Sequence, residues 1–273
     1  MSADAEGQEP GVFRAYFDRS QLFRPADVVA VGGFMAAISR WRHFEREWRK
    51  VLDRHGMEVF HMTDFETRQK QYATWSNEQR VAFVRQMIGV IRVHAWVAIA
   101  AAMVMKDYNG LGAEERRELG HPYALCGLKA VADTLRWVDD MLAGAKKTGR
   151  WKVLPKAHDV RIEFVFEAGD EGASELAAAL ESEKKSGAHG ERIWSWTFDN
   201  KGSAGALQAA DFAAYETTKQ LVRTIGADER RIRQSMDRLL QRVTYRAEYF
   251  NARSLREVLD NGKKHPAAAM RQA

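Results

Sequence analysis

Three acidic residues occupy positions from which a carboxylate could do chemistry. Asp18 ends the alternating segment 12–18, Glu167 follows the apolar run of the segment 160–170, and Asp211 lies inside the small-residue segment LQAADFAAYE. Carboxylate oxygens are the ligands that hard divalent cations prefer, and Mg²⁺ often keeps substrate phosphates among its other ligands. A pair of such ions suits phosphodiester hydrolysis by water. If the acids converge, we expect Asp18, Glu167 and Asp211 to be both the ligands of Mg²⁺ or Mn²⁺ and the catalytic residues.

Each of these acids also has a simple structural interpretation. Asp18, and Glu167 with Asp170 in the segment FEAGD, could be turn residues that follow strands. Asp211 shares a helical face with apolar or small residues, namely Leu207, Ala214, Thr218, Leu221 and Val222. A lone carboxylate in such a stripe is costly unless it is paired. A lysine, an arginine or a backbone cap could supply that pairing as well as a metal could.

The helix that carries Asp211 has a predicted orientation. Gln208 lies beside Asp211 on the helical wheel, whereas Glu216 points away from it and is predicted to face solvent. The small residues of this helix would let it lie close to the sheet: Ala206, Ala209, Ala210 and Ala213. Such an approach would bring Asp211 within range of the strand-end acids.

Further polar residues could support a site. His61 and Asp64 in FHMTDF would lie on one side of a short turn, although a structural turn with a partly buried histidine explains them equally well. Lys201 and Ser203 precede the Asp211 helix, where phosphate binding at a helix N-terminus would use such residues. Capping of the helix by Ser203 is the simpler interpretation.

The patterning predicts an α/β protein that would position these residues. Apolar alternation and buried runs predict strands at 12–18, 28–38, 95–105, 160–170 and 192–198. Helical periodicity predicts helices at 39–54, 76–93, 122–143, 173–185, 204–222 and 228–243, with a further helix at about 247–260. The segment 56–75 is predicted as a loop containing a short strand. Without the helices between the second and third strands, the order is β-β-β-α-β-α-β-α, a mixed sheet flanked by helices.

Domain boundaries and composition follow from the same pass along the chain. We expect a disordered N-terminus at 1–10, one domain at 11–225 with a helical insertion at about 39–93, and a helical extension and tail at 226–273. The net charge of +5 permits a nucleic-acid partner and does not require one. No apolar run is long enough for a membrane span. The single cysteine and the polar start indicate a cytoplasmic protein, and a protein partner or homo-oligomer stays open.

Four motifs carry a resemblance to a known family. In order, AYFDRS, EVFHMTDF, FVFEAGD and LQAADFAAYE resemble the bacterial family known as domain of unknown function 3800, over roughly residues 12–222. That family is grouped with the ribonuclease H-like superfamily, which has the element order given above. The resemblance implies metal-dependent phosphodiester chemistry with Asp18, Glu167 and Asp211 in the acidic cluster. It implies these neighbours of the cluster: Ser20, His61, Asp64, Asp170 and Gln208.

One position departs from the family pattern. The family commonly has Asp-Glu-Ser where this chain has Asp18-Arg19-Ser20, and strand parity points Arg19 away from Asp18. The leading hypothesis is a metal-dependent nuclease or related phosphodiester-processing enzyme. The alternative is an inactive ribonuclease H-like module that binds nucleic acid or a partner protein. A third interpretation, a scaffold without a site, requires the acids to be scattered in space. The sequence does not distinguish DNA from RNA, or endonuclease from exonuclease.

Overall fold

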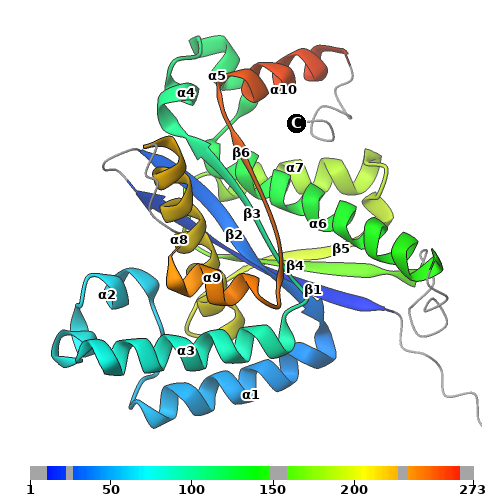
Figure 1. Ribbon diagram of the computed structural model, residues 1–273. Helices are drawn as coiled ribbons and strands as arrows, with labels where there is room; N and C mark the ends of the chain where they lie inside the picture. The colour runs from blue at the N-terminus through cyan, green and yellow to red at the C-terminus, as the bar shows by residue number, and fades with distance from the viewer. Residues whose placement is uncertain (1–10, 23–26, 148–158, 227–232, 265–273) are drawn as a thin grey trace, which may run out of the picture.

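A single six-stranded mixed sheet organises the chain (Figure 1). The computed structural model describes residues 11–22, 27–147, 159–226 and 233–264, so the expected disorder at 1–10 lies outside the described residues. The strand order is β5-β4-β1-β2-β3-β6. Antiparallel pairs join β1 to β2 and β2 to β3, and parallel pairs join β1 to β4, β4 to β5 and β3 to β6. The strands are β1 Val12–Leu22, β2 Val28–Ala37, β3 Val97–Val104, β4 Arg161–Glu167, β5 Ile193–Asp199 and β6 Thr244–Phe250.

Helices cover both faces of the sheet (Figure 1), and one large hydrophobic core lies on each face. One core lies under α6 Pro122–Lys147, α7 Ala173–Ser186 and α10 Ala252–Lys264, with the short helices α4 Met105–Asn109 and α5 Ala113–Leu119 nearby. The other lies under α8 Gly205–Ile225, α1 Ile38–Arg54 and α3 Asn77–His94, with α2 Met62–Glu66, the 3₁₀ helix η1 Lys70–Thr74 and α9 Gln234–Leu240. The predicted mixed α/β architecture is therefore confirmed at this level.

The alternation along β1 sends its residues to these two cores. Phe13, Ala15 and Phe17 pack on the α6 side, whereas Tyr16 packs on the α8 side. Asp18 has the parity of Tyr16, so its side chain faces α8. The sequence predicted that this strand ends at Asp18. The prediction is wrong, because pairing with β2 continues from Asp18 opposite Gly32 to Leu22 opposite Val28.

Two further secondary-structure predictions are wrong. Residues 244–250 form the strand β6 beside β3, and the helix predicted at about 247–260 begins only at Ala252. Leu255, Val258 and Leu259 form an apolar helical stripe, which led to the prediction of a helix that begins too early. The strand β6 itself is mostly exposed and lacks a clear alternation of apolar and polar residues. The segment 56–75 contains the helices α2 and η1 instead of a short strand.

The close approach of α8 to the sheet depends on a glycine of β2. A Cβ placed on Gly32 would lie 2.8 Å from both the Cα and the N of Ala214 in α8, which is closer than real Cβ contacts come. Gly32 is also the register partner of Asp18. The small residues Ala206, Ala209, Ala210 and Ala213 are all buried in the same core. The missing side chain at Gly32 therefore lets α8 carry Asp211 up to Asp18.

Adding a methyl group at Gly32 tests this packing. We expect Gly32→Ala to lower the free energy of unfolding by about 1–3 kcal/mol, because the new Cβ meets the backbone of α8 and not a flexible side chain. Urea unfolding measures it. Gly89→Ala is the matched control, since Gly89 lies exposed in α3 with nothing within 4 Å of an added Cβ. That control should be neutral or stabilising by up to about 1 kcal/mol. Equal effects of the two substitutions would contradict the close approach.

Candidate functional site

The three predicted acids surround the side chain of one lysine. Lys201, in the loop between β5 and α8, places Nζ 2.8 Å from Asp18 Oδ2, 2.9 Å from Glu167 Oε2 and 3.7 Å from Asp211 Oδ2. Because one nitrogen contacts all three carboxylates, they lie around one point. The interpretation in which the acids are scattered is therefore wrong.

The sheet register explains why these acids meet. β1 and β4 are parallel neighbours, with Phe17 paired to Phe166, so the next residues along the two strands are Asp18 and Glu167. Asp211 reaches the same point from α8, which packs on β1 and β2. Backbone groups fix two of the carboxylates: Arg19 N donates to Asp18 Oδ1 at 2.7 Å, and Met62 N donates to Asp211 Oδ2 at 2.8 Å.

The cluster holds more negative charge than its central lysine offsets. Asp18 and Asp211 are buried, with 3% and 4% exposure. Burial, together with the charge of Asp211, raises the pKa of Asp18 to about 7. Burial and the charge of Asp18 likewise raise the pKa of Glu167 to about 7. Burial alone would lower the pKa of Lys201, but the charges of Asp211 and Asp18 outweigh it and raise that pKa.

The donor atoms of the cluster suit a hard divalent cation. All three groups offer carboxylate oxygen, the ligand type of Mg²⁺. Asp18 Oδ2 and Glu167 Oε2 are buried, and apart from their ion pairs with Lys201 Nζ neither oxygen has a partner in the described interactions. Within the part of the chain that the structure describes, no three His, Cys, Asp or Glu side chains are placed as a metal site. The oxygens instead lie around Lys201 Nζ at the distances of ion pairs, which are longer than the ~2.0–2.1 Å between Mg²⁺ and its oxygen ligands.

His61 and Asp64, at the start of α2, lie beside Asp211. His61 Nε2 lies 3.9 Å from Asp211 Oδ2, and His61 Nδ1 lies 3.5 Å from Asp64 Oδ2. Burial and the nearby charge of Lys201 lower the pKa of His61. Asp64 pairs with Lys70 at 2.7 Å and does not contact Lys201 Nζ in the described ion pairs. These two residues are thus neighbours of the cluster, joined to it through Asp211.

Gln208 holds the loop that carries Lys201. Its Oε1 accepts hydrogen bonds from Trp48 Nε1 at 3.0 Å and Phe60 N at 2.9 Å, and its Nε2 donates to Lys201 O at 2.9 Å. The side chain is buried at 1% exposure. Gln208 therefore fixes the backbone of residue 201 relative to α1, α8 and the segment before α2.

The carboxylate of Glu45, and not Ser203, binds the backbone N–H groups at the N-terminus of α8. Glu45 of α1 accepts hydrogen bonds from Gly205 N at 2.9 Å and from Ala206 N at 3.0 Å. Ser203 donates to Asn200 O and does not cap the helix, whose N-cap residue is Ala204. The favoured interpretation, capping by Ser203, is therefore wrong, and the carboxylate of Glu45 stands at this helix end where a phosphate had been the other interpretation.

Arg19 forms an ion pair with Asp170 outside the cluster. Arg19 Nε lies 2.6 Å from Asp170 Oδ1, on the side of β1 opposite to Asp18, as parity predicts. Burial raises the pKa of Asp170, and the charge of Arg19 opposes that rise. Ser20 is half-buried two residues beyond Asp18, with the same parity. Asp170 and Ser20 lie near the cluster without contacting Lys201 in the described interactions.

Glu216 is buried, which overturns its predicted exposure. It is 1% exposed, its Oε2 lies 3.1 Å from Arg233 Nε, and its Oε1 accepts a hydrogen bond from Ser235 Oγ at 2.8 Å. Burial raises the pKa of Glu216, with Arg233 opposing. Arg233 also pairs with Glu66 of α2 at 2.7 Å. Sequence reasoning missed this because residues 233–235, distant from α8 along the chain, cover that side of the helix.

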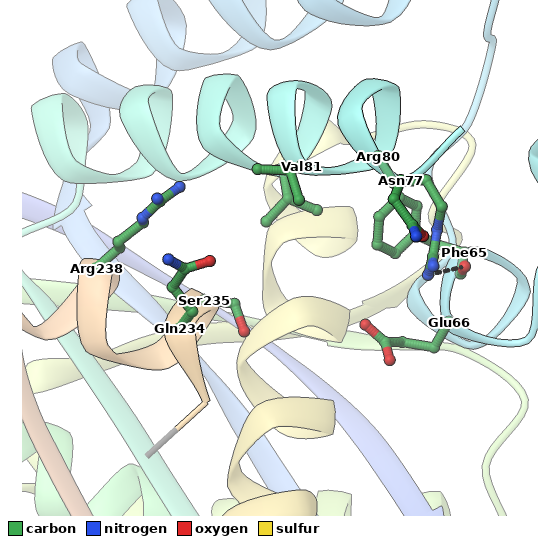
Figure 2. Close-up of a pocket in the computed structure, with 9 residues that line it drawn as sticks. Phe65, Glu66, Asn77, Arg80, Val81, Gln234, Ser235 and Arg238 are labelled. Atoms are coloured by element: carbon green, nitrogen blue, oxygen red, sulfur yellow. Dashed lines mark hydrogen bonds between the residues drawn. The ribbon is translucent and has the colours of Figure 1, made fainter. Parts of the chain in front are cut away.

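Two hollows lie near these elements. Figure 2 shows one of about 220 Å³ between α2, α3 and α9, where Glu66 and Ser235 line the wall and none of the three acids takes part. The other, of about 390 Å³, runs along β4 and β5 and is lined by polar groups that include Glu163, Thr197 and Ser203. Glu163 has the strand parity of Glu167, so this second hollow lies on the face of the sheet that carries the cluster.

Comparison with known proteins identifies no relative. The chain matches no protein-family model, no curated protein and no solved structure. The resemblance described from the motifs therefore stays a prediction. Within the described ranges, no helix has the length and apolar character needed to cross a membrane.

The raised pKa values predict how stability without metal depends on pH. In the unfolded chain Asp18 and Glu167 titrate near 3.8 and 4.5, and in the folded protein both titrate near 7. Between pH 4 and pH 7 the folded state thus binds more protons, so the free energy of unfolding falls as pH rises through that window. Asp18→Asn removes one of these groups. The measurement is the melting temperature of Asp18→Asn minus that of wild type, with a chelator present. We expect this difference to increase by about 2 °C or more from pH 5 to pH 8, because wild type loses stability over that range and the variant loses less.

Asp53→Asn, at an exposed position of α1, is the control for this comparison and should show no such trend. A difference between Asp18→Asn and wild type that stays constant across pH 5 to pH 8 would contradict the raised pKa of Asp18.

Proposed function

We propose that this protein is a metal-dependent nuclease or a related phosphodiester-processing enzyme, with Asp18, Glu167 and Asp211 as the ligands of Mg²⁺ or Mn²⁺. The observation that carries the proposal is the convergence of three carboxylates, from two strands and a helix, on one cation position. A ribonuclease H-like fold is part of the proposal. The order of three strands followed by alternating helices and strands supports it, and β6 is an addition to that order.

The surroundings of the cluster suit phosphodiester chemistry. When bound, a divalent cation would stabilise the negative charge of the phosphate and help to activate water. Asp18 and Asp211 hold their carboxylates in a buried, weakly polarisable environment, where charge interactions are stronger than in water. His61 is 40% exposed at its side chain, and its lowered pKa favours the neutral imidazole, which can accept a proton at a ring nitrogen. The hollow along β4 and β5 lies on the same face of the sheet as the cluster, although none of the three acids lines it.

A basic helix beside the cluster supports nucleic acid as the substrate class. The exposed face of α1 carries more basic than acidic residues: Arg40, Arg42, Arg46, Arg49, Lys50 and Arg54 against Glu47 and Asp53. Arg42, Arg46 and Lys50 are four residues apart and form one ridge about 12 Å long. The buried face of the same helix reaches the cluster through Trp48, which donates to Gln208. Such a ridge can follow phosphates toward the site. A cytoplasmic location is part of this proposal.

The second candidate is a catalytically inactive module that binds nucleic acid or a partner protein. Arg19 stands where the resembling family commonly has glutamate, and Lys201 already neutralises part of the cluster. These two cations favour a site that is stable without a metal. Binding without cleavage is the behaviour that separates this candidate from the enzyme.

Cleavage assays test the enzyme proposal. With Mg²⁺ or Mn²⁺, we expect hydrolysis of at least one of single-stranded DNA, double-stranded DNA, RNA or a hybrid. Asp211→Asn should reduce the rate about a hundredfold or more, because it removes a charge that holds the cation. Asp53→Asn should leave the rate unchanged. Activity that survives Asp211→Asn, or salt-dependent binding with no cleavage of any substrate, would sink the enzyme assignment.

The salt dependence of binding tests the ridge on α1. Replacing Arg42, Arg46 and Lys50 by alanine should make the slope of log affinity against log salt about 2–3 less steep on duplex DNA, since each lost phosphate contact contributes about 0.9. Fluorescence anisotropy with a labelled duplex measures the slope. The control is Arg253→Ala with Arg256→Ala on α10, which covers the opposite face of the sheet (Figure 1). If the control changes the slope as much as the ridge variant does, the ridge is not the contact surface.

A further inference from the structure

The side chain of Lys201 fills the position that the proposed metal would need. Its ammonium lies within 2.9 Å of both Asp18 Oδ2 and Glu167 Oε2, and the side chain is only 13% exposed. A divalent cation bound to the same oxygens would stand within contact distance of the ammonium. Two cations at one point repel each other strongly, so the cluster holds one of them at a time.

Neighbouring cations do not take this central position. Arg19 pairs with Asp170 on the other side of β1, and the exposed Lys70 pairs with Asp64. Their contacts therefore leave Lys201 as the group that a metal would meet at the centre.

The construction of the loop separates a fixed backbone from a movable side chain. The carbonyl of residue 201 is held by Gln208 Nε2, whose own side chain is tied to α1 through Trp48. The lysine ammonium, by contrast, stands on a flexible four-carbon stem and is held by its ion pairs with the three carboxylates. A change of side-chain rotamer can thus free the centre without moving α8 or the sheet.

We propose that Lys201 is a built-in counter-ion, which occupies the cation position in the metal-free protein and must leave it before a divalent cation binds. This inference rests on the proposed metal site. Lys201 then has two effects: it offsets part of the charge of the three buried carboxylates when no metal is present, and it weakens metal binding by competing for the same oxygens.

Calorimetric titration with Mn²⁺ alone tests the competition. Lys201→Met keeps an unbranched side chain, one heavy atom shorter, and removes its charge. We expect this variant to bind Mn²⁺ about tenfold or more tightly than wild type, because a positive charge at the site has been removed. Lys70→Met is the matched control, since it removes an exposed lysine that pairs with a neighbouring carboxylate. Its affinity should stay within about threefold of wild type.

The outcomes separate the two proposals. Equal or weaker Mn²⁺ binding by Lys201→Met, with measurable binding by wild type, overturns the counter-ion inference and leaves the metal site standing. No binding by wild type or by Lys201→Met overturns the metal site and the proposed function together.

Amine labelling of the wild-type protein gives a measurement that needs no variant to fold. We expect Lys201 to be protected from an acylating reagent without metal and to be labelled at saturating Mn²⁺, as seen by mass spectrometry of the peptides. Lys70, with 68% side-chain exposure, should be labelled in both conditions. Lys201 that stays protected at a Mn²⁺ concentration shown by calorimetry to saturate the protein contradicts its displacement.

Discussion

The contact between the ammonium of Lys201 and three carboxylates is the interaction on which the candidate site depends. Asp18 and Asp211 are buried, and Glu167 is half-buried, so their charges are poorly screened by water. One ammonium offsets only part of that charge, and burial together with the neighbouring carboxylates raises the pKa values of Asp18 and Glu167. A cluster with excess negative charge and only oxygen donors is suited to a divalent cation. The same excess explains why the chain places a lysine there when no metal is present.

A small number of structural constraints place Lys201 and the three carboxylates together. The parallel register of β1 and β4 sets Asp18 beside Glu167, and the absence of a side chain at Gly32 lets α8 approach the sheet. Glu45 occupies the N-terminus of α8, and Gln208 fixes the loop before it. Hydrogen bonds with Glu45 and Gln208 therefore anchor the backbone around the cluster, while the ammonium of Lys201 is held through ion pairs at the end of a flexible stem. The proposed exchange of Lys201 for a divalent cation would then require a change of rotamer and no change of the fold.

Much of this arrangement could be predicted from local sequence patterns. The alternation of β1 gave the correct face for Asp18, and the apolar stripe around Asp211 correctly indicated a buried carboxylate. The errors arose where a distant segment decides the outcome. Glu216 is buried because Arg233 and Ser235 cover it, and Ser203 does not cap α8 because Glu45 arrives from α1. β6 was missed since its pairing with β3, and not its own pattern, makes it a strand. The position of Lys201 among the three acids was not predicted either, because it depends on β1, β4 and α8 coming together in the fold.

A crystal structure of the wild-type protein grown with Mn²⁺ is the decisive experiment for the cation position, because anomalous scattering locates the ion without reference to activity. We expect an anomalous peak among the carboxylates of Asp18, Glu167 and Asp211, with their oxygens at ligand distance and Lys201 Nζ displaced from its present contacts. An empty cluster with Lys201 still in place, at a Mn²⁺ concentration that saturates the protein in solution, would rule out both the metal site and the displacement of Lys201.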